Sequence, residues 1–592
     1  MNILFIVVGV AALFYAAYIT YGKFLAKKIY ALDDNNVTPA VEMNDGLDYV
    51  PTDKKFLMGQ HFSAIAAAGP ITGPIIAGLA FGWLPTLIWI IVGSIFIGGV
   101  HDMGAMVASV RNKARSITET VRLNVSRRAW ILFNLFIWFT LVMIIVAFTD
   151  VTTSAFVNTV DLGNGQMVGG GAIATSSLLY LALPIIMGFL LKYTKINLTW
   201  ATIIFLPLVG VAIWVGQYIP LNMPAVLGLA PQKVWNIIVL IYCFVAAVVP
   251  VWALLQPRGH LGGYFLYASL IIAFIGVIFG GFKVQYPAFN PKGLDMAAVW
   301  PAMIPMLFIT VACGACSGFH SLVGSGTTSK QIKKEGDTKL VGYGMMLVEG
   351  IVAVIALSTV MIITKEDPLV TKSPNFVYAS GLGSFMKLIG VDVAFGISFG
   401  LMAFTTFVYD TLDICTRLGR YIIQELTGFK SWAGKIFATL LTGGVPLILM
   451  LITLKDASGN PVPAWKMFWT TFGASNQLLA GLALIGITVW LLNTAKFKKA
   501  WIFTFIPAVF MFIMSTWALI KMFLTYTVVE TMVDNVATKT FAFPVGAQVI
   551  IPIACLIYIV LAIWMAVETT LAFSRSKANP SAPANALGAP AK

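Results

Sequence analysis

The chain has 592 residues, of which 59% are hydrophobic and only 10% are charged. A soluble globular protein carries about 25% charged residues, so the composition excludes soluble enzymes, nucleic-acid-binding proteins and secreted scaffolds. The formal net charge of +14 says little about a substrate, because Lys and Arg accumulate in the cytoplasmic loops of membrane proteins for topological reasons.

The apolar residues form runs long enough to cross a bilayer, which takes about 20 residues per helix. A membrane β-barrel is excluded, because its strands would alternate polar and apolar residues over about ten positions. The sequence therefore predicts an all-α polytopic membrane protein with about 15 transmembrane helices. In chain order the runs fall at roughly 2–21, 60–81, 84–110, 129–149, 174–191, 199–219, 233–255, 262–281, 299–324, 338–363, 389–411, 432–454, 465–491, 500–520 and 545–572.

Basic residues are unevenly distributed between alternate loops. Most of the 38 Lys and Arg residues fall on one side, including those at 23–55, 111–128 and 330–339. Such an excess marks the cytoplasmic side, which predicts a multi-pass protein of the inner membrane with its N-terminus outside and its C-terminus inside. The tail 573–592 is rich in Ala and Pro and is predicted to be a disordered cytoplasmic segment.

Two of the runs are interrupted in a way that ordinary helices do not tolerate. Gly69-Pro70 and Gly73-Pro74 stand in the middle of 60–81, and each proline removes a backbone donor and clashes with the preceding turn. Glycines and hydroxyl residues crowd the segment 313–328. In the predicted topology the two runs cross in opposite directions, which is what an inverted repeat with two broken helices would produce.

Broken helices occur at membrane depth only where the freed backbone groups line a cavity or are buried in protein. The half-helix N-termini then offer N–H groups to an anion, and unwound carbonyls can hold a cation. A plainer alternative is that Gly and Pro, which are common in membrane helices, only kink these spans for packing. The candidate substrate-binding residues in the two spans are His61, Gly69, Pro70, Gly73, Pro74, Ser317, Gly318, Phe319 and His320.

Adjacent amides at Asn476 and Gln477 lie inside the run 465–491. Buried amides demand hydrogen-bond partners, and either a neighbouring helix or the substrate would satisfy them. The two histidines of the broken spans, His61 and His320, leave a similar choice between substrate or proton contact and an interhelical hydrogen bond.

Charged residues inside the spans are few and expensive, at about 2.5–3.5 kcal/mol each on the lenient insertion scale. Glu349 falls near the middle of 338–363 and is the leading candidate for a proton carrier or ion ligand, against a structural hydrogen bond to a neighbouring helix. Asp102 follows His101, so this pair could relay a proton or could anchor the helix end by pairing with Arg111 or Arg115.

Asp410 and Asp413 are further candidates for ion coupling. Asp413 and Arg417 stand at i,i+4 spacing, which fits a gate-like ion pair at the inner mouth or an ordinary interfacial salt bridge. Hydroxyls that could assist a cation site are Ser325, Thr327 and Thr328.

No cofactor or metal site is predicted. Cys313 and Cys316 form a CxxC pair, but a structural zinc site normally needs four protein ligands, so packing of small residues explains the pair better. The five cysteines form no disulfide framework. The G-x-x-x-x-G-K-[ST] motif is also missing from the loops, so ATP-driven transport would need a separate subunit.

These motifs resemble the carbon starvation protein A family, which is related to peptide and pyruvate uptake systems. The matching stretches are 47–52, 59–62, 68–74, 317–321, 324–331, 411–425 and 473–480. One departure is that the family pattern has two consecutive histidines where this chain has Gln60 and His61. A role that needs both rings is therefore in doubt here.

The resemblance implies a fold similar to the amino acid–polyamine–organocation superfamily, a five-plus-five inverted repeat whose first and sixth helices are broken. Seven spans separate the starts of the broken runs in this chain, so two extra helices must be inserted. The resemblance also implies a transporter core at 1–380 with both broken helices and a C-terminal five-helix unit at 381–572.

The sequence thus predicts a secondary active transporter, not an enzyme, with its site between 60–81 and 299–324. The resemblance implies import of peptides or pyruvate during carbon starvation, coupled to a proton or sodium gradient. The expected partners are this small-molecule substrate, the coupling ion H⁺ or Na⁺ and membrane lipid, with no nucleic acid; the oligomeric state stays open. A channel would need a continuous lined pore, and a membrane nutrient sensor is the other alternative.

Overall fold

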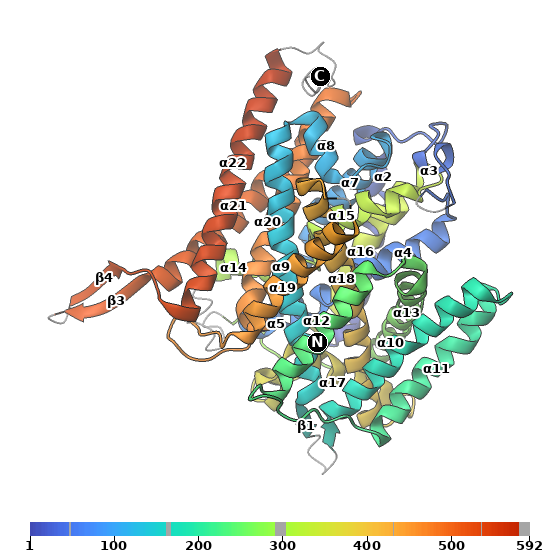
Figure 1. Ribbon diagram of the computed structural model, residues 1–592, viewed down its shortest axis with the longest axis vertical. Coiled ribbons are helices and arrows are strands. Elements are labelled where there is room, and N and C mark those ends of the chain that lie inside the picture. The colour runs from blue at the N-terminus through green and yellow to red at the C-terminus, as the bar shows by residue number, and fades with distance from the viewer. Residues whose placement is uncertain (47–48, 162–166, 291–302, 430, 534–535, 579–592) are drawn as a thin grey trace.

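The structure, a computed structural model, describes residues 1–46, 49–161, 167–290, 303–429, 431–533 and 536–578 (Figure 1). Thirteen helices in these ranges are long and apolar enough to cross a membrane. They are α1 (Ile3–Ile19, continued by α2, Tyr21–Phe24, and η1, Leu25–Ile29), α6 (Trp83–Gly93, continued by η2, Ser94–Gly98, and α7, Gly99–Arg111), α9 (Arg127–Val157), α10 (Gly170–Tyr193), α11 (Leu198–Tyr218), α12 (Pro231–Val248), α13 (Leu255–Phe279), η6 (Lys339–Gly344) with α16 (Met345–Met361), α18 (Val393–Thr427), α19 (Trp432–Leu451), α20 (Ala464–Thr494), α21 (Ile502–Thr527) and η8 (Gly546–Val549) with α22 (Ile550–Ala578).

Both interrupted runs are broken in the structure. The first consists of α4 (Lys54–Ile65) and α5 (Gly69–Phe81), bent by 48°. The second consists of the short helices α14 (Met303–Thr310) and α15 (Phe319–Gly326), with residues 311–318 non-helical between them. The predicted polytopic all-α fold with two broken helices is confirmed, although residues 299–302 of the second run lie outside the described residues.

Shorter elements connect the spans. The helical ones are α3 (Pro39–Glu42), α8 (Ile117–Asn124), η3 (Val251–Ala253), η5 (Thr328–Lys330), η7 (Pro368–Thr371) and α17 (Pro374–Lys387). Two antiparallel hairpins are present, β1 (Thr159–Asp161) with β2 (Met167–Gly169) and β3 (Val528–Val533) with β4 (Val536–Phe541). The second hairpin projects far from the helices (Figure 1).

The packing of the helices shows the inverted repeat. The broken helix α5 packs against α16, and α15 packs against α7 in the same relation. Likewise α13 packs on α17 and α18, whereas α20 packs on α8 and α9. The helices α12 and α19 pack on each other. These contacts are consistent with two repeats. The first runs from α4 to α13, and the second runs from α14 to α20.

The two inserted helices are α10 and α11. They stand between α9 and α12 in the chain and pack chiefly on each other, with further contacts to α9, α13 and α18. Figure 1 shows α11 at the edge of the molecule, outside the central helices. The insertion therefore leaves the central pairing of the repeats intact.

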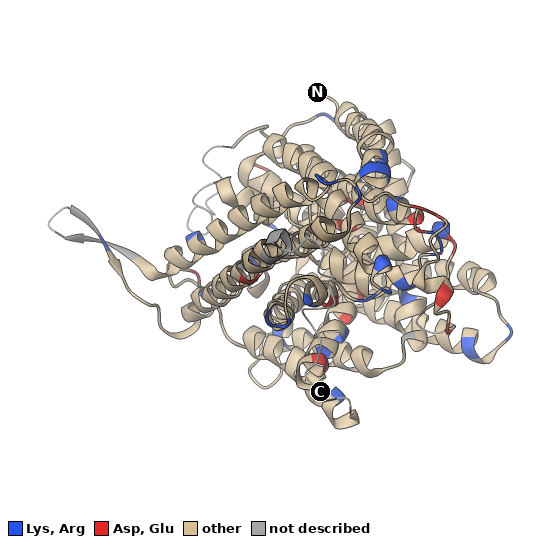
Figure 2. Ribbon diagram, turned by 90° about the horizontal axis from the view of Figure 1, so that it is seen from above, with Lys and Arg blue, Asp and Glu red and all other residues tan. Residues whose placement is uncertain are grey.

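Charged residues are sparse along the helices, as the mostly tan ribbon of Figure 2 shows. The predicted division at residue 380 stays a prediction; α18 and α20, which follow it, pack directly on α9, which precedes it. The helix α22 continues to Ala578, and the remainder of the predicted tail, 579–592, lies outside the described residues.

Candidate functional site

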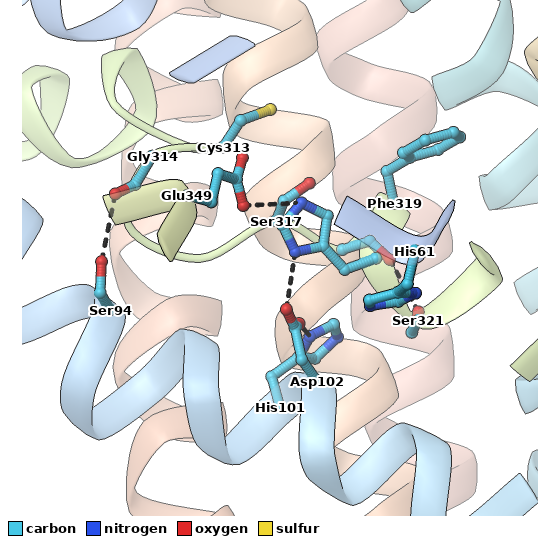
Figure 3. A network of polar contacts seen from close by, with 12 residues as sticks. His61, Ser94, His101, Asp102, Cys313, Gly314, Ser317, Phe319, Ser321 and Glu349 are labelled. Carbon is cyan, nitrogen blue, oxygen red and sulfur yellow. Dashed lines mark hydrogen bonds and ion pairs between the residues drawn. The ribbon is translucent and has the colours of Figure 1, made fainter. Parts of the chain in front are cut away.

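A buried ionisable cluster lies where α15 meets α7 and α16. His320 Nδ1 is 2.8 Å from Asp102 Oδ2, and His320 Nε2 is 3.2 Å from Glu349 Oε2. In Figure 3 the dashed lines from Asp102 and Glu349 meet on the ring between them. His101 adds a second imidazole, with Nδ1 2.7 Å from Asp102 Oδ1. These four residues, Asp102, His101, His320 and Glu349, are called the His320 cluster below.

The His320 cluster is sealed from solvent, since none of its four residues is more than 2% exposed. Its members come from three helices, of which α7 is far in the sequence from α15 and α16. The alternative in which Asp102 pairs with Arg111 or Arg115 is wrong, because Arg111 pairs with Glu335 and Arg115 with Glu119. Asp102 instead faces the interior, where a charge needs a partner or a function.

Several polar atoms of the cluster have no hydrogen-bond partner among the described residues. The contact of His320 Nε2 with Glu349 lacks hydrogen-bond alignment, and both Glu349 oxygens are unpartnered, as is His101 Nε2. With one imidazolium, two carboxylates would still leave a surplus negative charge in the protein interior. An uncompensated buried charge is costly, so the cluster is suited to take up and release protons.

His61 lies on α4, one turn before the break. Its Nδ1 is 2.8 Å from Thr328 Oγ1, while its Nε2 is buried without a hydrogen-bond partner among the described residues. The hydrogen bond ties α4 to η5, the turn that follows α15. Thr328 therefore contacts a histidine in this structure and not a group of oxygen ligands.

The other two hydroxyls of the predicted cation site are engaged separately. Ser325 Oγ donates to Ser321 O at 2.5 Å and accepts from Ile117 N at 2.9 Å. Thr327 is exposed, and its Oγ1 donates to Val323 O at 3.0 Å. The structure does not bring these hydroxyls together with Thr328 around one point.

The two helix breaks lie directly against each other. A Cβ added at Gly69 would lie 2.3 Å from Cys313 Sγ, and one added at Gly73 would lie 2.4 Å from Thr310 O. Gly314 is equally close-packed against Ala353, with Pro70 and Pro74 next to it. Glycine at these positions permits the contact, because any larger residue would push the two unwound segments apart.

Asn476 on α20 satisfies the unwound backbone before α15. Its Oδ1 accepts from Phe319 N at 3.0 Å, its Nδ2 donates to Ser317 Oγ at 3.1 Å, and its backbone oxygen accepts from Gly318 N at 3.1 Å. Gln477 Nε2 donates to Phe308 O on α14, and its Oε1 has no hydrogen-bond partner among the described residues. The sequence left open whether these amides bond a neighbouring helix or the substrate. In the structure Asn476 bonds the segment at the start of α15.

A second buried ionic cluster involves Arg258, which lies between the predicted apolar runs 233–255 and 262–281. Arg258, on α13, is 1% exposed and pairs with Asp410 and Asp413 of α18. The predicted pairing of Asp413 with Arg417 is wrong, because Arg417 donates to the carbonyls of Ala246 and Val249 at the end of α12. The only sequence signal was that Arg258 directly precedes an apolar run of helical length.

An open cavity of about 330 Å³ lies at the ends of α15 and α18, beside α8. Charged residues of both signs line it, including Arg115, Glu119, Lys330 and Glu425. Ser325 on α15 also lines it, whereas His320, one to two turns earlier on the same helix, does not. The cavity therefore approaches the breaks along α15 without reaching the His320 cluster.

Among the described residues, no group of three or more His, Cys, Asp or Glu side chains is arranged to hold a metal ion. Cys313 and Cys316 are both buried free thiols, and Cys313 packs against Gly69 as described above.

The family model described as "Carbon starvation protein CstA" matches residues 1–377 and 366–518 of the chain. The chain belongs to this family. The resemblance seen in the motifs is confirmed, although Leu47 and Asp48 of the first motif lie outside the described residues.

Curated members of the CstA family match most of the chain. A peptide transporter CstA of Helicobacter pylori is 31% identical over 572 residues, covering 86% of this chain and 80% of that protein. The peptide transporter CstA of Escherichia coli K12 is 30% identical, covering 85% and 78%. The pyruvate/proton symporter BtsT of the same organism is 28% identical, covering 89% and 82%.

Solved structures of other membrane transporters also match. A manganese transporter of Eremococcus coleocola aligns with a TM-score of 0.43 at 14% identity, covering 90% of this chain and 99% of that one. MhsT in complex with L-phenylalanine aligns with a TM-score of 0.45 at 12% identity, covering 80% and 99%.

Proposed function

We propose that this chain is a secondary active transporter that imports a small carboxylate-bearing nutrient, a peptide or pyruvate, together with protons. Relatives named as peptide transporters and as a pyruvate/proton symporter support the substrate class. The observation that supports proton coupling is the sealed His320 cluster, in which one imidazole stands between two carboxylates. The inner membrane and the carbon starvation condition belong to this proposal.

The composition of the His320 cluster favours a proton over sodium. A hard metal cation is held by a shell of oxygen ligands, whereas this cluster places two imidazole rings between and beside its carboxylates. Carboxyl and imidazole groups in contact exchange protons readily, because small changes of environment change the protonation state of a histidine near neutral pH. A proton is therefore the ion that this donor set suits.

Coupling follows from where His320 is placed. It is the second residue of α15, directly after the unwound segment 311–318 that packs against the break of α4 and α5. A substrate that shifts this segment would change the distances from His320 to Asp102 and Glu349. Substrate binding and protonation would then bias the same element, which is the requirement for coupling two ligands.

The carboxylate of the substrate is expected at the start of α5. The N-terminus of α5 has no side-chain hydrogen-bond cap, and a helix N-terminus suits an anion. The carboxylate would have to replace bonds within the chain there, because Ile71 N and Thr72 N both donate to Ala68 O. At the N-terminus of α15, Asn476 accepts from Phe319 N. His61, with its Nε2 unpartnered among the described residues, is the nearest candidate for a second substrate contact, one turn before the break.

The proposal is tested by uptake of labelled pyruvate into proteoliposomes under an imposed inward proton gradient, with unlabelled dipeptides and tripeptides as competitors. Uptake that an uncoupler abolishes and that peptides leave unchanged identifies a proton-linked monocarboxylate importer. Pyruvate flux that peptides suppress assigns both substrates to one site. If neither pyruvate nor peptides enter proteoliposomes that contain folded protein, the proposal is wrong. If uptake depends on the sodium gradient at a constant proton gradient, proton coupling is rejected.

Glu349→Gln provides the residue-level test. The amide keeps the size of the side chain but cannot exchange a proton, so gradient-driven uptake is expected to be lost while substrate exchange without a gradient persists. Glu366→Gln is the matched control, because Glu366 is exposed in the loop after α16. Gradient-driven uptake at the wild-type rate in Glu349→Gln would remove Glu349 from the coupling mechanism.

A further inference from the structure

Arg258, Asp410, Asp413 and Tyr242 form a second ionic cluster, called the Arg258 cluster below. Arg258 Nε donates to Asp410 Oδ1 at 2.8 Å, and its Nη1 contacts both Asp413 Oδ2 and Tyr242 Oη. Tyr242 Oη also donates to Asp413 Oδ2 at 2.9 Å. Arg258 Nη2 donates to the backbone oxygen of Tyr409 at 2.9 Å, so each nitrogen of the guanidinium has a partner.

The charges of this cluster do not balance. Two carboxylates face one guanidinium, and the side chains of Arg258, Asp410 and Asp413 are 1%, 8% and 0% exposed. Asp413 Oδ1 is buried with no hydrogen-bond partner among the described residues. A buried ion pair is tolerated when every charge is paired, and here one negative charge is left over.

The surrounding groups do not supply the missing positive charge. The other titratable groups that face the cluster are neutral phenols and thiols, contributed by α10, α12 and α18: Tyr180, Cys243, Tyr409 and Cys415. Arg417 is the nearest further cation on α18, but it donates to the carbonyls at the end of α12. The cluster therefore lacks one unit of positive charge.

We propose that the Arg258 cluster is a second proton-binding site, in which one proton is shared between Asp410 and Asp413. When the proton is bound, it neutralises the surplus carboxylate and gives Asp413 Oδ1 a hydrogen. When the proton is released, the cluster carries a net negative charge. A metal cation fits poorly, because the guanidinium occupies the centre and Asp413 Oδ2 already contacts Arg258 and Tyr242.

The cluster is placed where its proton can affect the transport site. It joins α12 and α13 of the first repeat to α18 of the second. A Cβ at Gly262 would lie 2.7 Å from Asp410 Oδ2, and one at the adjacent Gly263 would lie 3.6 Å from the Cβ of Ser63, close to the break of α4. A change in the charge of Asp410 alters its attraction to Arg258 and would thus act on the part of α13 that contacts α4.

The proton is detected by infrared difference spectroscopy between high and low pH on the full chain reconstituted in lipid. The wild-type protein is expected to show a band of a protonated carboxylic acid that both Asp413→Asn and Asp410→Asn remove, because either change leaves a neutral pair. Glu366→Gln should leave this band unchanged. Glu349→Gln should also leave it, and should remove only a separate band that belongs to Glu349.

Two outcomes overturn the proposal. One is a difference spectrum that neither Asp413→Asn nor Asp410→Asn changes. The other needs neither aspartate variant and holds even if both misfold: a wild-type spectrum whose only protonated-carboxyl band is the one that Glu349→Gln removes. Neither result depends on a substrate, so both are distinct from failure of the proposed transport function.

The consequence for transport rests on the proposed function and is measured separately. The reversal potential of pyruvate flux in proteoliposomes gives the number of protons carried per substrate. Asp413→Asn is expected to carry one proton fewer than the wild-type protein, whereas Glu366→Gln keeps the wild-type ratio. An unchanged ratio in Asp413→Asn would refute a transported proton at this cluster.

Discussion

Asn476 shows what one buried amide contributes to this fold. It hydrogen-bonds the backbone of Phe319 and the side chain of Ser317, and so supplies partners to a segment that has left the helix. Substituting Asn476→Ala removes a cap, which costs about 1 kcal/mol, and leaves buried polar groups unpaired, at about 1–3 kcal/mol. Thermal unfolding of the purified protein should therefore begin at a lower temperature.

The matched control for this substitution is Asn493→Ala. Asn493 lies on the same helix, α20, but is exposed, so its loss should leave the unfolding temperature unchanged. Equal unfolding temperatures for the wild-type protein and Asn476→Ala would contradict the capping role.

At the residue scale the sequence identifies most of the buried ionisable residues but few of the residues that they contact. Glu349, Asp102 and His320 all stand out, because charged or titratable residues in apolar spans are costly. Their meeting at one point depends on helices α7, α15 and α16, of which α7 is distant in the chain from the other two. Arg258 lies between two predicted apolar runs, 233–255 and 262–281, so its place inside α13 could not be predicted. The partner of Arg417 was missed for a similar reason, since i,i+4 spacing describes only contacts within one helix.

At the scale of elements, the contact between the two helix breaks depends on glycine. A Cβ at Gly69 would overlap Cys313 Sγ at 2.3 Å and its Cβ at 2.5 Å. We therefore expect Gly69→Ala to destabilise the protein by about 1–3 kcal/mol, the usual cost of overpacking, and to reduce uptake. Because Cys313→Gly removes both atoms, the double variant should recover part of the lost stability.

The control for Gly69→Ala is Gly210→Ala on α11, where an added Cβ has no atom within 4 Å. Both variants add the same methyl group to a glycine in a helix. The unfolding temperature should fall only for Gly69→Ala. A double variant with Cys313→Gly that is no more stable than Gly69→Ala alone would show that the contact with Cys313 is not the cause.

A second element-scale feature joins the segment before α4 to the segment after α15. Glu335, buried, accepts from Arg111 Nε at 2.6 Å and from Asp33 N at 2.8 Å. Thr38 Oγ1 donates to Ile332 O at 2.6 Å, and Thr52 N donates to Gln331 O at 3.0 Å. These bonds tie the entrance of one broken helix to the exit of the other.

Glu335 makes this junction sensitive to acid. Burial alone would raise the pKa of Glu335, but hydrogen bonds from Arg111 and Asp33 outweigh burial and hold its pKa below the ordinary value, which is about 4.3. A carboxyl with a depressed pKa stabilises the folded state above its ordinary pKa, and this contribution is lost as pH falls through the lower value. The junction should therefore be intact at neutral pH and loosen only in acid.

Hydrogen–deuterium exchange of the segment 33–38 measures this junction. Glu335→Ala should exchange faster than the wild-type protein at neutral pH, and the difference should be lost as the pH falls through the depressed pKa of Glu335. Glu42→Ala, at an exposed position in the same region, should exchange like the wild-type protein. Equal exchange of Glu335→Ala and the wild-type protein at neutral pH would be evidence against the junction.

The elements themselves were largely predictable, because apolar length alone fixes most of them. The break at Gly69 follows from Pro70, which lacks an N–H. The helix α17 was not predicted, because its 14 residues are shorter than a membrane span. Its burial between α5, α13, α16 and α18 comes from tertiary packing, which no local pattern reveals.

At the scale of the whole molecule, the two repeats are coupled through the places where they touch. The first repeat contributes Asp102 and Arg258, and the second contributes His320, Glu349, Asp410 and Asp413. Both ionic clusters thus straddle the boundary between repeats. A relative movement of the repeats must change the charge contacts in both clusters, which is how a proton could control which side of the membrane the site faces.

The distribution of basic residues predicts the orientation of the chain in the membrane. Ser458 and Lys498 are exposed at opposite ends of α20, and the predicted topology places Ser458 outside and Lys498 in the cytoplasm. All five native cysteines are buried, so background labelling by a membrane-impermeant maleimide should be low. In intact cells we expect Ser458→Cys to be labelled and Lys498→Cys to be labelled only after the membrane is permeabilised. The reverse pattern would place the C-terminus outside, and the open cavity beside α8 would then face the exterior.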